Sequence, residues 1–210
     1  TNNVLLDLGR SRPTNRTLGW GGGIVDWDGG VMAANMFLHH PPGSANNGRG
    51  ILLNANGQEG EIGMRNLTVR GNLFHGLHGA RQAMAVQGSQ RMQNVTIAGN
   101  MFQFQDVPKP LLTVDAETTG LNLRENVYWS EAEPGRWFSL GGESLSFEEW
   151  VQRSGEEGAR REMLEFPDPD RNIEAYMQSL EMEPSIDAFI AVAREQSRRN
   201  WRPEFTARAV

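Results

Sequence analysis

Two groups of side chains in this sequence could carry out chemistry on a bound molecule. The first is cationic and falls in three polar segments, residues 38–49, 75–82 and 103–110. It consists of all four histidines, two arginines and the only lysine, namely His39, His40, Arg49, His75, His78, Arg81 and Lys109. The second is a carboxylate pair, Asp26 and Asp28. Because histidine titrates near neutral pH, the first group offers general bases beside fixed positive charges.

The cationic group has the composition that β-elimination from a uronate sugar requires. A positive group must neutralise the sugar carboxylate, which makes the neighbouring C5 proton acidic, and a base must then remove that proton. Arg81 or Arg49 could neutralise the carboxylate. The candidate bases, with the lysine as second choice, are His40, His75, His78 and Lys109. These residues favour a polysaccharide lyase that acts on an acidic polysaccharide.

The carboxylates and aromatic residues support two alternatives. A glycoside hydrolase would use Asp26, Asp28 or Asp115 as general acid and base and would not need the histidines. A non-catalytic polysaccharide-binding or adhesin module would need only a groove and an aromatic platform, for which Trp20 is the candidate. No cofactor is expected, although the Asp26–Asp28 pair could instead hold Ca²⁺. The histidines predict no metal site.

A recurring phrase indicates which elements must position these side chains. "NLTVRGNLFHG" at 66–76 is followed by "NVTIAGNMFQF" at 94–104, and weaker versions occupy 30–40 and 120–130. An alternating strand precedes one asparagine in each phrase and an apolar pair follows it. These asparagines are Asn35, Asn72, Asn100 and Asn126. Such recurrence predicts stacked coils of β-strands, in which each coil buries its apolar face against its neighbours.

The four asparagines are expected to form one column, with their side chains turned into the coils. Asparagine tolerates the left-handed backbone conformation that a tight bend between two strands requires. Stacked in a column, the side-chain amides can hydrogen-bond from one coil to the next. The asparagines are therefore interpreted as structural residues.

The phrase resembles that of the right-handed parallel β-helix proteins, the pectate-lyase-like superfamily, over roughly residues 20–140. The stretches "SFEEWVQRSG", "FPDPDRNIEAY" and "FIAVAREQSRRNWRPEFTARAV" are similar to C-terminal extensions of bacterial exported β-helix proteins. The resemblance implies an all-β fold, a right-handed parallel β-helix with a C-terminal α-helical cap. It also implies a secreted, periplasmic or cell-surface protein. In this superfamily the groove beside the first strand of each coil is the usual sugar-binding cleft.

The layout of the superfamily divides each coil into three strands and a loop. First strands are then expected at 23–28, 50–54, 83–87 and 111–115, and the three cationic segments become neighbouring loops on one flank. Alternation along these strands puts eight side chains inside: Val25, Trp27, Ile51, Leu53, Met84, Val86, Leu112 and Val114. An outward ladder at the strand ends would consist of Asp28, Asn54, Gln87 and Asp115. These four, with Asp26, Trp20 and Lys109, are the predicted substrate-binding residues.

Residues 141–210 differ in character from the coils expected over 1–140. Ser146 and Glu149 have the spacing of a capping box, and Ser185 can cap a second helix over 186–199. A short helix is expected near 171–180. We expect this segment to cap the stack of coils, because the raw edge of a β-helix would invite other chains to pair. The residues expected to pack against Trp137 and Phe138 are Trp150, Phe189 and Ile190.

Composition excludes several classes of partner. The chain has a formal net charge of −6, and its acidic excess falls in residues 141–210. Residues 1–140 therefore have no excess of basic side chains that would predict a nucleic-acid partner. No apolar run approaches the about 20 residues that a membrane span needs. There is no cysteine, which leaves no disulfide or thiolate chemistry. The opening "TNNVLLDLG" suggests that the coils continue a longer helix.

Overall fold

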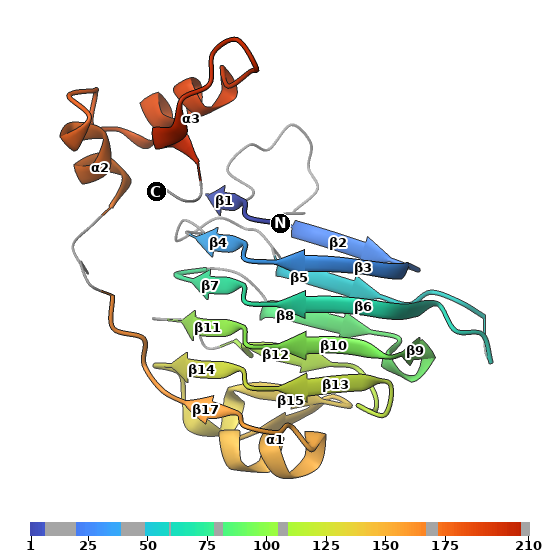
Figure 1. Ribbon diagram of the computed structural model, residues 1–210. Coiled ribbons are helices and arrows are strands. Elements are labelled where there is room, and N and C mark those ends of the chain that lie inside the picture. The colour runs from blue at the N-terminus through green and yellow to red at the C-terminus, as the bar shows by residue number, and fades with distance from the viewer. Residues whose placement is uncertain are drawn as a thin grey trace, which may run out of the picture.

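The computed structural model describes residues 1–6, 20–38, 49–58, 60–77, 82–104, 109–166 and 172–206, and most of their strands lie in three sheets (Figure 1). The first sheet consists of β2 (Trp20–Val25), β5 (Arg49–Asn54), β8 (Gln82–Gln87), β12 (Leu112–Val114), β15 (Phe138–Leu140) and β16 (Glu143–Leu145). The second consists of β3 (Asp28–Ala33), β6 (Met64–Arg70), β10 (Val95–Ala98) and β13 (Leu121–Arg124), and β9 (Met92–Gln93) also pairs with β6. The third consists of β1 (Val4–Leu6), β4 (Met36–Leu38), β7 (Leu73–His75), β11 (Met101–Phe104), β14 (Val127–Ser130) and β17 (Arg160–Arg161).

Successive turns of the chain add one strand to each sheet. For example, β5, β6 and β7 follow one another in sequence, and each pairs in parallel with the strand that precedes it in its own sheet. All described pairings are parallel except that of β15 with β16. Neighbouring strands in such a ladder lie about 4.8 Å apart. This stack of three parallel sheets is compatible with the parallel β-helix predicted from the sequence.

The predicted column of asparagines is confirmed, and all four side chains are buried. The backbone N–H and the Nδ2 of Asn35 both donate to Oδ1 of Asn72, at 3.0 and 2.9 Å. Asn72 donates in the same way to Asn100, and Asn100 to Asn126. The expected left-handed conformation belongs to the preceding residue instead, with positive φ at Ala34, Gly71, Gly99 and Glu125. Asparagine is thus required here for its amide, because each one both donates and accepts along the column.

Two residues that the phrase did not reveal end the column. Asn3 donates from its backbone and from Nδ2 to Oδ1 of Asn35, at 3.1 and 2.9 Å. At the other end Asn126 donates from Nδ2 to Oε1 of Glu156, at 2.7 Å. The other carboxylate oxygen of Glu156 accepts from Trp150 Nε1 at 2.7 Å and from the Tyr128 hydroxyl at 3.0 Å. Burial raises the pKa of Glu156, although these hydrogen bonds act in the opposite direction.

A row of aromatic rings runs through the interior beside the asparagine column. Phe37, Phe74, Phe102 and Tyr128 stack in that order, with ring centroids 4.7 to 5.1 Å apart. Each ring is contributed by the apolar pair that follows a buried asparagine, as the phrase predicted. Gly50 makes room for this row, because a Cβ there would lie 2.7 Å from the Phe74 ring. The aromatic row and the asparagine column together fix the register of the coils.

The first strand of the first sheet lies in a register different from the one predicted. Val25 pairs with Asn54, so Ile24, rather than Val25, points inward and is buried. The chain then turns at Asp26, where φ is +50°, and Trp27 is 51% exposed. The prediction that Val25 and Trp27 are interior residues is therefore wrong. The other six side chains predicted inside are buried: Ile51, Leu53, Met84, Val86, Leu112 and Val114.

Within its described residues, the C-terminal segment forms three α-helices, of which only the first contributes to the hydrophobic core of the sheets. α1 (Phe147–Ser154) begins with the predicted capping box of Ser146 and Glu149. Trp150 is fully buried and stacks on Phe138 at 4.8 Å, as expected. α2 (Ile173–Ser179) matches the predicted short helix, and α3 (Ile186–Arg194) ends five residues before the predicted boundary. Short 3₁₀ helices occupy Ser89–Arg91, Pro134–Arg136 and Pro203–Phe205.

The prediction that Phe189 and Ile190 pack on the last coil is wrong. Phe189 lies in a second cluster with Met177 and Phe205, and Ile190 packs against the same cluster. In Figure 1, α1 lies at the end of the stack that holds β15 and β17, whereas α2 and α3 lie toward the end that holds β1. An amphipathic sequence shows that a helix has an apolar face, but it does not show which surface that face covers. Within the described ranges, no helix has the length and hydropathy to span a membrane.

Candidate functional site

The cationic residues are positioned by the junction between the third and first sheets. Leu38, His75 and Gln103 pair side by side at the ends of β4, β7 and β11. From these ends the chain passes to the first sheet, where Arg49 and Gln82 pair at the starts of β5 and β8. The strand ends agree with the loop boundaries predicted from the sequence. The described ends of the predicted loops therefore lie side by side along one flank of the stack.

The described part of this flank contains three of the predicted residues. The half-buried His75 ring meets the ring of Phe166 edge-on, with centroids 5.0 Å apart. Arg49 is also half-buried, whereas Lys109 is exposed. The remaining predicted residues lie outside the described residues, and they are His39, His40, His78 and Arg81. We call the strand ends that carry His75 and Arg49 the histidine flank.

The carboxylate pair lies in a different place, at the bend from the first to the second sheet. Asp26 and Asp28 line a pocket of about 320 Å³ with Trp27, Glu61 and Arg65. We call it the Trp27 pocket. Ile62, which also lines it, is 44% exposed. An exposed indole beside hydrogen-bonding carboxylates can hold a sugar ring, since the indole offers an apolar face and the carboxylates accept from hydroxyls.

The two carboxylates of this pocket already have protein partners. Asp26 Oδ1 accepts from the Asn56 backbone N–H at 2.7 Å. Asp28 accepts from Asn66 Nδ2 at 3.0 Å and pairs with Arg65 Nε at 2.9 Å. The hydrogen bond from Asn66 and then the one from Arg65 lower the pKa of Asp28. A general acid needs a pKa shifted in the opposite direction, so Asp28 is poorly suited to protonate a leaving group.

The predicted outward ladder of the first sheet is correct except at its first member. Asn54 and Gln87 pair side by side, and Asp115 N–H donates to the carbonyl of Val86. Val25 occupies the position predicted for Asp28. The carboxylate of Asp115 accepts from the backbone N–H of Gly88 at 2.7 Å, which holds the following turn. Trp20 begins β2, and its side chain lies outside the described residues.

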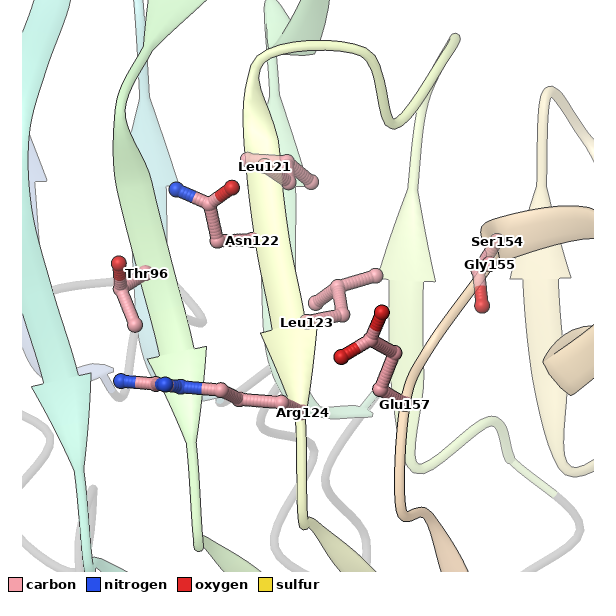
Figure 2. A pocket seen from close by; sticks show the side chains of 8 residues that line it. All are labelled: Thr96, Leu121, Asn122, Leu123, Arg124, Ser154, Gly155 and Glu157. Atoms are coloured by element: carbon pink, nitrogen blue, oxygen red, sulfur yellow. The ribbon is translucent and has the colours of Figure 1, made fainter.

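Sequence reasoning missed a second pocket, which lies beside β13 (Figure 2). Its volume is about 410 Å³, and it is lined by Thr96, Leu121, Asn122, Leu123, Arg124, Ser154, Gly155 and Glu157. We call it the β13 pocket. Its walls come from two strands and from a segment about 30 residues further along the chain, so no local motif could reveal it. Among the described residues there is no cluster of three or more His, Cys, Asp or Glu placed to hold a metal ion.

No family model matches this chain, and comparisons with curated proteins and with solved structures gave no match either.

Proposed function

We propose that the chain is a right-handed parallel β-helix of the pectate-lyase-like type, with α1 as its C-terminal cap. Three parallel sheets that gain one strand per turn support the β-helix. The stacking of Trp150 on Phe138 supports the cap. The pairing of Glu156 with the last asparagine supports it as well, because it ends the column of donors.

We propose that the protein cleaves an acidic polysaccharide by β-elimination at the histidine flank. The observation that carries this proposal is the register of β4, β7 and β11, which brings His75 into line with the strand ends of the neighbouring coils. His75 would remove the C5 proton, and Arg49 would neutralise the uronate carboxylate. His40, His78, Arg81 and Lys109 would complete the site from the adjoining loops. A polysaccharide substrate agrees with the location outside the cell that the resemblance implies.

The test is an elimination assay on alginate, pectate and glycosaminoglycans. Elimination leaves an unsaturated uronate that absorbs in the ultraviolet, whereas hydrolysis releases reducing ends without that absorbance. His75→Ala should lower the rate about 100-fold while leaving binding nearly intact, because a general base acts mainly in the transition state. Arg49→Ala should weaken both binding and rate. Arg70→Ala, which removes an exposed arginine of the second sheet, is the matched control and should change neither.

A second candidate function is sugar binding without cleavage, and the Trp27 pocket favours it. The pocket pairs an exposed indole with three carboxylates and only one arginine, Arg65. The pocket therefore has an excess of negative charge, which would repel the carboxylate of a uronate, so a neutral sugar fits it better. A glycoside hydrolase is less well supported, because the pKa of Asp28 is lowered rather than raised.

The charge of the preferred polysaccharide distinguishes these functions. Binding of a neutral polysaccharide, lost in Trp27→Ala and retained in His75→Ala, would support the Trp27 pocket. Reducing ends released from a neutral polysaccharide, and abolished in Asp26→Asn, would support a hydrolase. An elimination product that persists unchanged in the His75→Ala and Arg49→Ala double variant would refute the histidine flank as the site.

A further inference from the structure

In the second sheet, the last strand keeps an uncovered stretch at the C-terminal end of the stack. In the first sheet β16 pairs with the whole of β15, and in the third sheet β17 pairs with the first two residues of β14. In the second sheet β13 is met only at Arg124, by an isolated bridge to Glu157. The β13 pocket lies where the rest of that covering strand is missing.

The uncovered stretch presents one backbone donor and one backbone acceptor. The carbonyls of Gly120 and Arg124 accept from β10 and from the residue after β10. Because the backbone groups of alternate residues in a strand point to opposite sides, those of Leu121 and Leu123 point to the uncovered side of β13. On that side Leu123 C=O accepts from Glu157 N–H at 3.3 Å. Across the described part of the chain, Leu123 N–H and Leu121 C=O have no partner. Both groups therefore face the β13 pocket.

The pocket is closed along the strand at both ends. At one end the Thr118 hydroxyl donates to the carbonyl of Ser154 at 3.3 Å. At the other, Glu125 N–H donates to the carbonyl of Glu157 at 2.7 Å. A peptide strand would have to continue past both of these hydrogen bonds, because it gains stability only over several residues. The space instead suits a compact ligand.

The side chains around the pocket add polar groups to this backbone pair. Asn122 Nδ2 donates to Asn94 at 3.4 Å, which leaves Asn122 Oδ1 as an acceptor. Figure 2 shows Arg124 extending across β10 to a position below Thr96, away from the Glu157 carboxylate. The guanidinium and the threonine hydroxyl thus lie on one side of β13 and the carboxylate on the other. The pocket offers both donors and acceptors and lacks an aromatic platform.

We propose that the β13 pocket binds a single sugar unit at the end of a saccharide. A donor and an acceptor on the same strand edge call for a ligand that has both functions a few ångströms apart, and neighbouring ring hydroxyls supply them. One hydroxyl accepts from Leu123 N–H, and its neighbour donates to Leu121 C=O. Arg124 then contacts a further hydroxyl or a carboxylate of the same sugar. This site is separate from the histidine flank and from the Trp27 pocket, and it does not depend on the proposed lyase activity.

Amide NMR on the full chain tests this proposal directly. Glucose, galactose, glucuronate and galacturonate would be titrated separately, with a Kd of about 1 mM expected for so few contacts. The amide signal of Leu123 should shift most, together with those of Asn122 and Arg124. Arg124→Ala should weaken binding about tenfold, which is the effect of one hydrogen bond to a charged group. Arg70→Ala is the matched control, because Arg70 has the equivalent outward position on β6, two strands away.

Each remaining outcome contradicts the proposal. A Leu123 amide that stays unmoved by all four sugars would overturn it. Equal losses in Arg124→Ala and Arg70→Ala would show only nonspecific attraction. Shifts caused by a short extended peptide, but not by the sugars, would indicate strand addition at this edge. Sugar-induced shifts confined to Trp27 and its neighbours would leave the second candidate function standing and remove this one.

Discussion

Each asparagine of the buried column serves as donor and acceptor at once. Its two N–H donors point toward the next turn of the chain, and its Oδ1 receives the two donors of the previous turn. The remaining N–H of Asn100 donates to the carbonyl of Val69. Replacement of Asn100 by alanine therefore leaves both donors of the previous turn without an acceptor, while the next turn keeps one donor from the backbone.

Asn100→Ala should lower the free energy of unfolding by about 3 kcal/mol or more. The change leaves the backbone N–H of Asn72 and one N–H of its Nδ2 without an acceptor, and each buried unpaired group costs about 1–3 kcal/mol, whereas Oδ1 of Asn126 keeps the backbone N–H of residue 100. Urea denaturation would measure the change. Asn122→Ala is the matched control, because Asn122 is exposed and makes one long hydrogen bond; its effect should stay within about 0.5 kcal/mol. Equal effects of the two variants would contradict a special role of the column.

The buried carboxylate of Glu156 predicts a distinctive pH dependence. Its pKa is raised in the folded protein, so the folded state holds the proton more tightly than the unfolded state does. Stability from this group is therefore fully present below its ordinary pKa and is lost as the pH rises through the folded-state value. Over that pH range the melting temperature of wild type should therefore fall relative to that of Glu156→Gln, which lacks the titrating carboxyl group.

Glu157→Gln provides the control for this comparison, because it removes an exposed carboxylate one residue away. Thermal melts of the three proteins at a series of pH values would separate the effects. The opposite outcome is a melting temperature of wild type that rises with pH relative to that of Glu156→Gln. It would show that the hydrogen bonds from Asn126, Tyr128 and Trp150 outweigh the desolvation of the carboxylate.

At the scale of single residues, the sequence predicted the four asparagines of the column but not Asn3 and Glu156, which continue it on either side. Four asparagines stood out because the same strand and apolar pair surrounded each of them. Asn3 shows only one half of the phrase, the apolar pair Val4-Leu5 that follows it. Glu156 lies 30 residues beyond Asn126 and belongs to no phrase. A partner that is set by three-dimensional proximity leaves no local pattern.

Among the elements, α1 is the one that joins the helical segment to the core. Its capping box is complete, since Ser146 accepts from Glu149 N–H and Glu149 accepts from Ser146 N–H. The helix has only eight residues, too few to be stable without packing. Its position is secured by Trp150, which is held between the Phe138 ring and the Glu156 carboxylate.

Ser146→Ala should destabilise the protein by about 1 kcal/mol, the usual cost of losing an N-cap. Because α1 carries Trp150, the near-ultraviolet circular dichroism of the folded protein should also change. Urea denaturation would give the energy. Ser144→Ala, at an exposed position of β16, is the control and should be nearly neutral. If both variants behave alike, α1 is held by Trp150 alone.

The elements were predicted well where alternation or capping marked them and poorly where glycine removed the pattern. The boundaries of β5 and β8 and the start of α1 agree with the sequence within a residue. The first strand was shifted by three residues because Gly21, Gly22 and Gly23 give no inside or outside signal. That shift moved Trp27 from the predicted interior to the surface pocket. The candidate site changed with it, since the exposed indole is the main feature of the Trp27 pocket.

On the scale of the whole molecule, two hydrophobic clusters are separate. The larger runs through the three sheets and includes Trp150 from α1. The smaller holds Met177, Phe189 and Phe205 from the last helices. No residue is shared between them, so the end of the chain should contribute little to the stability of the sheets.

Two truncations test this division. A chain that ends after Phe166 should keep the unfolding midpoint of the sheets and remain monodisperse in size-exclusion chromatography. A chain that ends after Leu140 also loses β16, α1 and β17, which uncovers Phe138 and several hundred Å² of apolar surface, on the order of a patch that drives association. It should therefore aggregate. Aggregation of both chains would mean that α2 and α3 do cover the stack.

The asparagine column also gives the stack an electrical direction. Every side-chain amide in it is oriented with Nδ2 toward the C-terminal end and Oδ1 toward the N-terminal end, so the amide dipoles add along the axis. The positive pole meets the carboxylate of Glu156, much as the N-terminus of an α-helix attracts an anion. The negative pole is Oδ1 of Asn3. A second copy facing this oxygen with its own Asn3 would bring two acceptors together, so whatever continues the column past Asn3 has to present N–H donors there.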